Sequence, residues 1–287
     1  MGENFGLFKS FGDKLFEGET PTNLGLIGST SLNDSDAQAF FNRVAAAGGT
    51  LTETEQDAVN TLVFQMKSIG VWTGMKAIYP MVGSSAAACA QNLKSASFTG
   101  TFSSGWTFAS TGVTPNGTSA FMNTGFKPST EGLTYNNNQV SFYSRTSAQN
   151  GATQFYDIGS GDGGSTDNLS LFIRRSTDLA GYDSGNFATN RATFSNTNGQ
   201  GFYCGTAATT TSKYFKNGIS QVSQSLSASS ISNFNTYIGA FNQADSTTFY
   251  SIKQCAFASM GLGLTDTQAA NFYTVVQAFQ TSLSRQV

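Results

Sequence analysis

The chain has 287 residues, a formal net charge of -2 and only 11% charged residues. This length fits one large domain with an accessory segment, and the lack of clustered Lys and Arg argues against a nucleic-acid partner. The chain contains no histidine, which excludes a Ser-His-Asp or Cys-His catalytic relay. No segment approaches the roughly 18 apolar residues of a membrane span, and no signal peptide is visible at the N-terminus, so we expect synthesis in a reducing cytoplasm and no membrane association.

An N-terminal arm, residues 1–30, precedes the rest of the chain. Large apolar residues recur in it at three- and four-residue steps, which predicts a short amphipathic helix. The pattern fits packing on its own domain and docking on another chain equally well, and it fits a membrane surface less well because the polar face is not rich in Lys and Arg. The candidate anchoring residues are Phe5, Phe8, Phe11, Leu15 and Phe16.

Residues 31–83 predict a helical segment. Ser35 with Gln38 fits a capping box at the start of one helix, and Thr52 with Glu55 fits a second. The apolar junction 71–83 then changes from a helical to a strand period, and we expect it to pack these helices against the following domain.

Residues 84–287 predict a β-sandwich that ends in a helix. Short segments, among them 139–145 and 168–175, alternate with a two-residue period, and Gly/Asn/Asp-rich breaks separate them. The sharpest signal is Asn217-Gly218, which predicts a two-residue type I′ hairpin turn. A bent strand or strand pair is expected over 249–263, and Thr265 with Gln268 predicts a third capping box. The fold class is therefore mainly β, an antiparallel jelly-roll sandwich with helices at both ends.

Three cysteines, Cys89, Cys204 and Cys255, lack metal-type spacing. We expect three buried thiols, and a Cys204–Cys255 bridge is the alternative. Asp157, Asp162, Asp167 and Asn168 offer oxygen atoms to Ca²⁺, but their spacing matches no EF-hand, so we expect neither a metal site nor a cofactor.

Several segments together resemble the concanavalin A-like, laminin G-like proteins of bacteriophage virions. The resemblance covers residues 31–287 and implies a jelly-roll fold, a place on a phage particle and sugar recognition. The segments that carry it are 72–82, Asn92-Leu93-Lys94, Gly105-Trp106-Thr107, 114–118 and 264–273.

The resemblance leads to three functional hypotheses. The first is a virion structural protein, a surface fibre, decoration or tail-associated component that is held by the arm, displays the sandwich and binds host glycan. A homo-oligomer, by analogy with fibres a trimer, accompanies this hypothesis. The second is a dedicated receptor-binding lectin. The third, a polysaccharide-degrading enzyme, is disfavoured because Glu131 is the only Glu after Glu55 and no strand carries a close carboxylate pair.

Sugar recognition needs exposed rings for stacking and polar side chains for the hydroxyls. Each candidate also has a structural interpretation, as core packing or turn formation. Arg174 or Arg175 offers a contact to an acidic glycan, with an ion pair on the strand face as the alternative. The candidates for glycan binding are Trp106, Asp162, Asp167, Asn168, Tyr182, Asp183 and Asn186.

Overall fold

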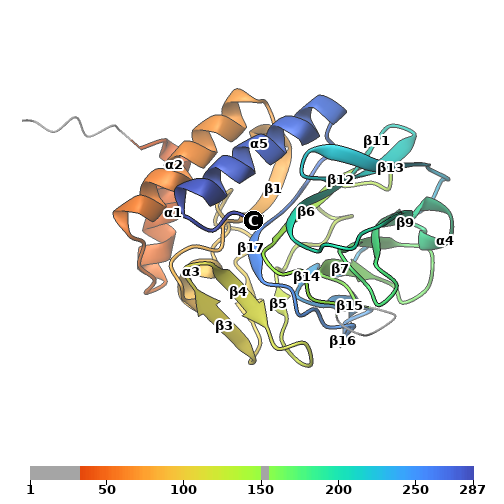
Figure 1. Ribbon diagram of the computed structural model, residues 1–287, viewed down its shortest axis with the longest axis horizontal. Helices are drawn as coiled ribbons and strands as arrows, with labels where there is room; N and C mark the ends of the chain where they lie inside the picture. The colour runs from red at the N-terminus through yellow and green to blue at the C-terminus, as the bar shows by residue number, and fades with distance from the viewer. Residues whose placement is uncertain (1–32, 150–154) are drawn as a thin grey trace, which may run out of the picture. The chain divides into compact units, whose positions relative to one another are not determined.

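The computed structural model describes residues 33–149 and 155–287, and the predicted N-terminal arm lies outside them. Residues 33–287 form one compact unit. It contains two β-sheets that pack face to face and a group of helices on one of them (Figure 1). No helix in this described part is long and apolar enough to cross a membrane.

The first sheet has eight strands. Every pair in it is antiparallel. In spatial order the strands are β13 (Ile219–Ser225), β12 (Thr211–Lys216), β11 (Gly201–Ala208), β6 (Asn137–Ser144), β17 (Cys255–Gly261), β4 (Gly112–Pro115) and β3 (Trp106–Ala109), with β1 (Met75–Tyr79) paired to β17.

The second sheet has nine strands and is antiparallel apart from the parallel pair of β15 with β7. The predicted mainly-β antiparallel sandwich with helices at both ends is confirmed. In spatial order the strands are β10 (Ala192–Ser195), β9 (Leu179–Gly185), β8 (Asn168–Phe172), β7 (Ile158–Gly161), β14 (Tyr237–Ile238), β5 (Met122–Asn123) and β2 (Thr101–Phe102), with β15 (Phe241–Gln243) on β7 and β16 (Ser246–Thr248) on β15.

The strand alternation determines which side chains fill the core between the sheets. In β6, Val140 and Phe142 face the inter-sheet core, whereas Tyr143 points to the opposite face and joins the core beneath the helices. Successive residues of a strand point to opposite faces, so the central strands β11, β6 and β17 of this sheet are buried on both sides.

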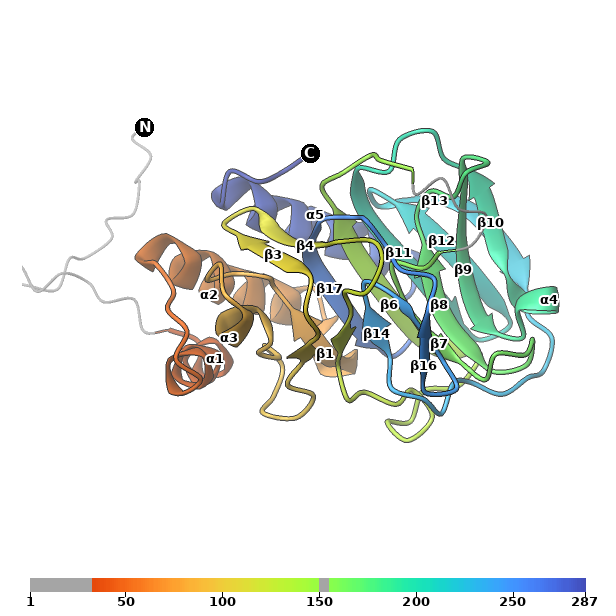
Figure 2. The ribbon, with the colours of Figure 1, turned by 90° about the horizontal axis from the view of Figure 1, so that it is seen from below.

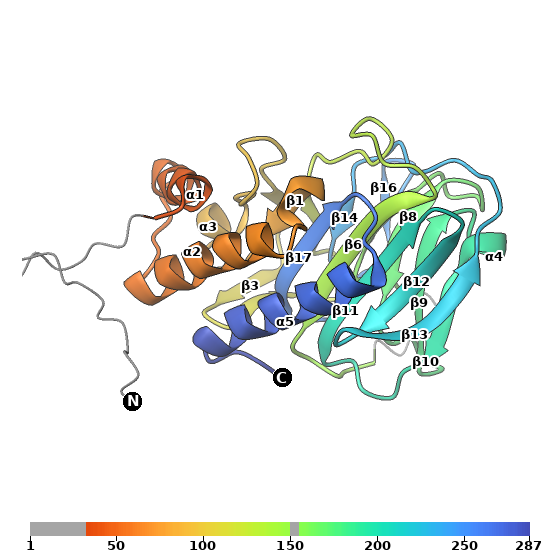
Figure 3. The ribbon, with the colours of Figure 1, turned by 90° about the horizontal axis from the view of Figure 1, so that it is seen from above.

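Two long helices, α2 (Glu53–Ser68) and α5 (Asp266–Ser282), lie side by side over the outer face of the eight-stranded sheet, and the third, α1 (Ser35–Ala46), packs on α2 beside them (Figure 3). The short helix α4 (Phe187–Asn190) instead follows β9 at the end of the nine-stranded sheet (Figure 2). Of the described helices, none packs across the outer face of that second sheet, although the residues of β7, β8 and β9 on this face are almost all buried. Besides α4, the helical elements of the described residues are α1 (Ser35–Ala46), α2 (Glu53–Ser68), α3 (Ala86–Cys89), α5 (Asp266–Ser282) and the 3₁₀ turn Trp72–Gly74.

The helix starts agree with the sequence in two of three cases. The capping boxes that begin at Thr52 and Thr265 are confirmed. The box predicted at Ser35 is wrong, because Asp34 is the N-cap and accepts a hydrogen bond from the backbone N–H of Asp36. The Asp34 carboxylate also pairs with Lys67 Nζ of α2 at 2.6 Å, which a local pattern cannot anticipate.

The predicted hairpin turn is confirmed. Asn217 and Gly218 have φ angles of 49° and 74°, and Lys216 pairs with Ile219 across the turn. The strand predicted over 249–263 is shorter, since only β17 is a strand and Phe249 has a positive φ of 54°. The expectation of three buried free thiols is confirmed, and no Cys204–Cys255 bridge forms.

Candidate functional site

The outer face of the nine-stranded sheet carries a small aromatic cluster. The outward-facing residues of β8 are Asn168, Ser170 and Phe172, whereas Leu169 and Leu171 point into the inter-sheet core. Phe172 pairs with Gly181 of β9. A Cβ on Gly181 would lie 2.1 Å from Phe172 Cζ. The missing side chain of Gly181 therefore leaves room for the outer edge of the Phe172 ring.

A pocket with a volume of about 220 Å³ lies beside this cluster. Aromatic rings line it together with nitrogen-bearing side chains, and its described lining contains no carboxylate. It therefore offers no acid and base pair of the kind that hydrolyses a glycosidic bond. Its main lining residues are Tyr156, Asn168, Arg175, Arg191, Phe241 and Phe249.

One arginine of the pocket is paired with a carboxylate. Arg191 donates from Nε to Asp183 Oδ1 at 2.5 Å and from Nη2 to Asp183 Oδ2 at 2.9 Å. Arg191 Nη2 also donates to Tyr156 Oη at 3.1 Å, and Ser170 Oγ donates to Asp183 Oδ2 at 2.7 Å. The Asp183 charge raises the pKa of Arg191 against the opposing effect of burial, so the Arg191 guanidinium and the Asp183 carboxylate neutralise each other.

The other arginine has no such partner. Arg175 is only 7% exposed, and its guanidinium carbon lies 3.5 Å from the ring centroid of Phe172 and 4.9 Å from that of Tyr156. Its Nε and Nη2 atoms are buried and have no hydrogen-bond partner among the described residues. Burial lowers the pKa of Arg175, and the Tyr156 hydroxyl partly opposes this effect. A buried cation without a carboxylate is costly, and cation–π contacts with the rings offset only part of that cost.

Asn168 supplies another unpaired donor to the same pocket. The residue is 3% exposed, and its Nδ2 has no hydrogen-bond partner among the described residues. In most proteins, buried polar groups are hydrogen-bonded. The residues that line the pocket thus include two, Arg175 and Asn168, whose buried N–H groups have no acceptor among the described residues.

Several of the predicted glycan-binding residues lie around this pocket. Asn168 lines it, and Asp183 lies beneath it in the ion pair with Arg191. Asp162 and Asp167 belong to the loop whose glycines 163 and 164 form part of the wall. Asn186 caps α4 by accepting from the backbone N–H of Ala188, which places Phe187 at the pocket.

The two predicted aromatic platforms lie elsewhere. Tyr182 points into the inter-sheet core with no exposed surface, and its hydroxyl donates to Asn138. Alternation along β9 necessarily puts it on the face opposite to Asp183. Trp106 lies on β3 of the other sheet and packs edge-on against Phe102. Neither ring borders the pocket.

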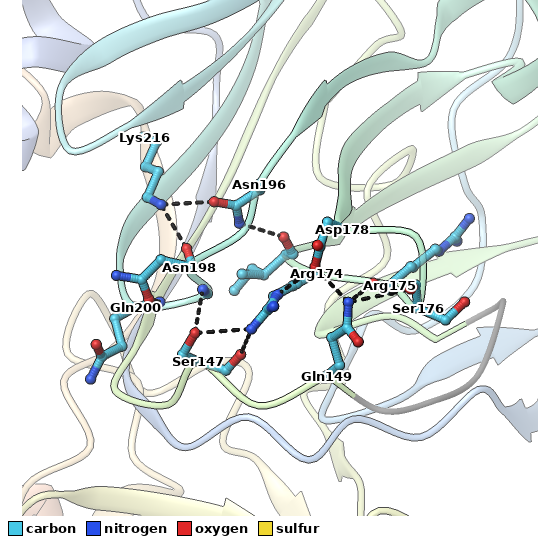
Figure 4. A network of polar contacts seen from close by, with 12 residues as sticks. Ser147, Gln149, Arg174, Arg175, Ser176, Asp178, Asn196, Asn198, Gln200 and Lys216 are labelled. Carbon is cyan, nitrogen blue, oxygen red and sulfur yellow. Dashed lines mark hydrogen bonds and ion pairs between the residues drawn. The ribbon is translucent and has the colours of Figure 1, made fainter.

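The adjacent Arg174 has a structural role that separates it from Arg175. It pairs with Asp178 at 2.8 Å and donates from Nη1 to the carbonyl oxygen and hydroxyl of Ser147. Figure 4 shows Arg174 inside this network and the side chain of Arg175 pointing away from it. The ion pair that was the alternative interpretation of these two arginines thus forms at Arg174. Of the two, only Arg175 lines the pocket.

The loop at the pocket wall contains two interacting carboxyl groups. Asp167 Oδ1 accepts from the backbone N–H of Asp162 at 2.7 Å. Burial, followed by the side chain of Asp162, raises the pKa of Asp167 to about 6. Among the described residues no group of three or more His, Cys, Asp or Glu side chains could hold a metal ion.

A larger cavity of about 430 Å³ lies between the start of α2 and the end of α5. Among the described residues that line it, only Glu55 is charged, and its carboxylate accepts from the backbone N–H groups of Gly83 and Thr52. The carboxylate is therefore committed to the fold. The smaller pocket on the second sheet is the better candidate because its buried donors are unpaired.

Sequence reasoning considered Arg175 and Asn168 but missed Tyr156, Arg191 and Phe249. Alternation along 168–175 gives a signal for Asn168, because it places this residue opposite to the core-facing leucines. Arg191 and Phe249 carry no comparable signal. They reach the pocket only through the pairing of distant strands.

Comparisons with known proteins give a distant likeness in overall architecture. No protein-family profile matches the chain, and no curated protein sequence matches it. Domain 4 of the extracellular arabinanase AbnA from Geobacillus stearothermophilus, solved with arabinotriose, is similar over 69% of this chain and 98% of its own, with 12% identity and a TM-score of 0.47.

Two further solved structures are similar to parts of the chain. The binding domain of botulinum neurotoxin serotype D matches over 71% of this chain and 52% of its own, with 12% identity and a TM-score of 0.45. NanB sialidase from Streptococcus pneumoniae matches over 47% of this chain with 13% identity and a TM-score of 0.36. The match spans 23% of the sialidase chain.

Proposed function

We propose that this sandwich is a glycan-binding module and that its site is the pocket lined by Arg175, Asn168 and Tyr156, called here the Arg175 pocket. The observation that carries the proposal is the set of buried, unpaired N–H donors beside aromatic rings. Sugars offer hydroxyl and ring oxygens as acceptors and C–H faces that pack on rings. A site with this composition matches both features.

The size of the pocket supports a small ligand unit. Pockets for drug-sized molecules have volumes of roughly 300–1,000 Å³, and the Arg175 pocket has about 220 Å³. One sugar residue fits this scale better than a long oligosaccharide. Recognition of a terminal or branching sugar of a larger glycan follows from that size.

The test is glycan binding by the purified chain, first on a glycan array and then by calorimetry. Asn168→Ala removes one unpaired donor and should weaken binding of the best glycan about tenfold, whereas Asn233→Ala, at an exposed asparagine, is the control. Circular dichroism checks that both variants fold. If no glycan binds, or if Asn168→Ala binds as tightly as the control, the proposed site is refuted.

The finer part of the proposal places this module on a bacteriophage particle. Its support is the sequence resemblance to concanavalin A-like virion proteins and the apolar pattern of the N-terminal arm. The module acts there as a fibre, decoration or tail-associated component, the arm docks on other virion proteins, and the chain assembles as a trimer. Glycan binding then attaches the particle to its host.

A truncation tests the role on the particle. Deletion of residues 1–19 should leave a folded module that still binds glycan but no longer incorporates into particles. The measurement is the copy number of the truncated chain in purified virions. Incorporation at the normal copy number would refute the anchoring role of the arm and leave the glycan site untouched.

A further inference from the structure

The two arginines of the Arg175 pocket differ in one respect. Arg191 uses Nε and Nη2, the two N–H groups on one edge of its guanidinium, to hold both carboxylate oxygens of Asp183. Arg175 has the same two atoms buried and without a partner among the described residues. The same edge of the guanidinium is thus paired with a carboxylate in Arg191 and has no partner among the described residues in Arg175.

We infer that the ligand of this pocket carries a carboxylate, which binds the Nε and Nη2 edge of Arg175 as Asp183 binds that of Arg191. The inference rests on the proposed function and narrows it to an acidic sugar. Asn168 Nδ2 then donates to another oxygen of the same sugar, and the aromatic rings contact its carbon face.

The charges of the site support a single negative charge on the ligand. Arg175 and Arg191 contribute two positive charges, and Asp183 contributes one negative charge that is already paired with Arg191. Among the side chains that line the pocket, the Arg175 charge is thus left without a carboxylate partner, between walls that are largely aromatic. Charge-assisted bonds to a bidentate carboxylate are among the strongest hydrogen bonds in proteins, so a monoanion completes the site.

The geometry favours a planar group over a tetrahedral one. The Arg175 guanidinium lies against the ring of Phe172 at 3.5 Å, so its free edge lies along the ring surface. A carboxylate places two oxygens in the plane of that edge. A sulfate or phosphate ester also binds arginine but adds further oxygens that would press on the neighbouring rings.

The Nε and Nη2 atoms of Arg175 are shielded from solvent. A carboxylate therefore reaches them only when a side chain at the rim moves aside. Gln243 and Phe249 are half-buried residues of the pocket lining and are the residues in a position to move. Binding should consequently change the environment of Arg175 directly.

The experiment follows the arginine Nε–H signals by ¹⁵N–¹H NMR while sugars are added to the full-length chain. The probes are the methyl glycosides of glucuronic acid and N-acetylneuraminic acid, their methyl esters, and a sulfated neutral sugar. The chain has six arginines, and Arg175→Lys identifies the Arg175 signal by its loss. We expect at least one acidic probe to shift this signal and to bind at least tenfold more tightly than its ester.

A matched pair of variants separates the binding edge from charge alone. Arg175→Lys keeps the charge but loses the two-pronged edge, so it should weaken binding of the acidic sugar at least tenfold. Arg174→Lys makes the same change at the neighbouring residue outside the pocket and should alter affinity less than twofold. Thermal melting checks that both variants are folded.

The outcomes separate this inference from the proposed function. Equal binding of acid and ester, tighter binding of the sulfated sugar, or full affinity in Arg175→Lys would overturn the carboxylate assignment and leave glycan binding intact. Glycan-array binding that depends on Asn168 but involves only neutral sugars would likewise overturn the carboxylate assignment and leave glycan binding intact. If neither acidic nor neutral glycans bind, both the carboxylate assignment and the proposed function are refuted.

Discussion

The sharpest structural test of the site is Gly181→Ala. A Cβ at this position would lie 2.1 Å, 2.5 Å and 2.9 Å from Cζ, Cε1 and Cε2 of Phe172. These distances are too short for any real contact, so the ring must rotate. The face of the same ring lies against Arg175, and the methyl group therefore acts on this arginine through the Phe172 ring.

The magnitude follows from two opposing effects. Overpacking of a tightly packed site typically costs about 1–3 kcal/mol, and the change from Gly to Ala returns roughly 0.4–1 kcal/mol by restricting the unfolded chain. We expect a net loss of about 1–2 kcal/mol in the free energy of unfolding. For a domain of this size, that loss corresponds to a lowering of Tm by roughly 2–8 °C.

Chemical denaturation and calorimetry of glycan binding provide the assay, and Gly74→Ala is the matched control. A Cβ on Gly74 would meet only Leu262 Cβ at an ordinary 3.6 Å, so this variant should be at least as stable as the parent chain. Gly181→Ala should also weaken glycan binding at least tenfold. Parental stability and affinity in Gly181→Ala would refute the tight arrangement of Phe172 and Arg175.

Three further predictions concern the fold. Gly218→Val should lower the free energy of unfolding by roughly 1–3 kcal/mol, because Gly218 has a φ of 74° and a new Cβ would lie 2.9 Å from Tyr273 Cδ1; an unchanged denaturation midpoint would contradict this. Because the pKa of Asp167 is raised to about 6 from 3.8, the folded state retains a proton that the unfolded state loses. The contribution of Asp167 to stability should therefore decrease as the pH rises from about 4 to 6 and stay constant above that. Asp167→Asn should remove this part of the pH dependence of the denaturation midpoint. Identical pH profiles of the variant and the parent chain would contradict the raised pKa of Asp167. Arg285→Met should cost at least about 2 kcal/mol, because this fully buried side chain donates to three backbone carbonyls; a melting temperature equal to that of the parent chain would disprove this role.

The sequence by itself determined the features that depend on neighbouring residues. Period-two alternation identified β6 and β8 and the faces that their side chains share, because the pleat sends successive side chains to opposite sides. Asn217-Gly218 specified the turn, since both positions need a positive φ that these residues tolerate. The caps at Thr52 and Thr265 also follow from local hydrogen bonds.

Tertiary structure alone decided which of these faces became a site. Alternation shows that Tyr182 and Asp183 point in opposite directions, but only the packing of the second sheet puts Tyr182 inside and Asp183 beneath the pocket. The same applies to Arg175, whose Nε and Nη2 atoms have no partner among the described residues because Arg191, the residue that follows α4, pairs with Asp183. Strand pairing over long sequence separations brings these groups together, and no local pattern encodes such pairing.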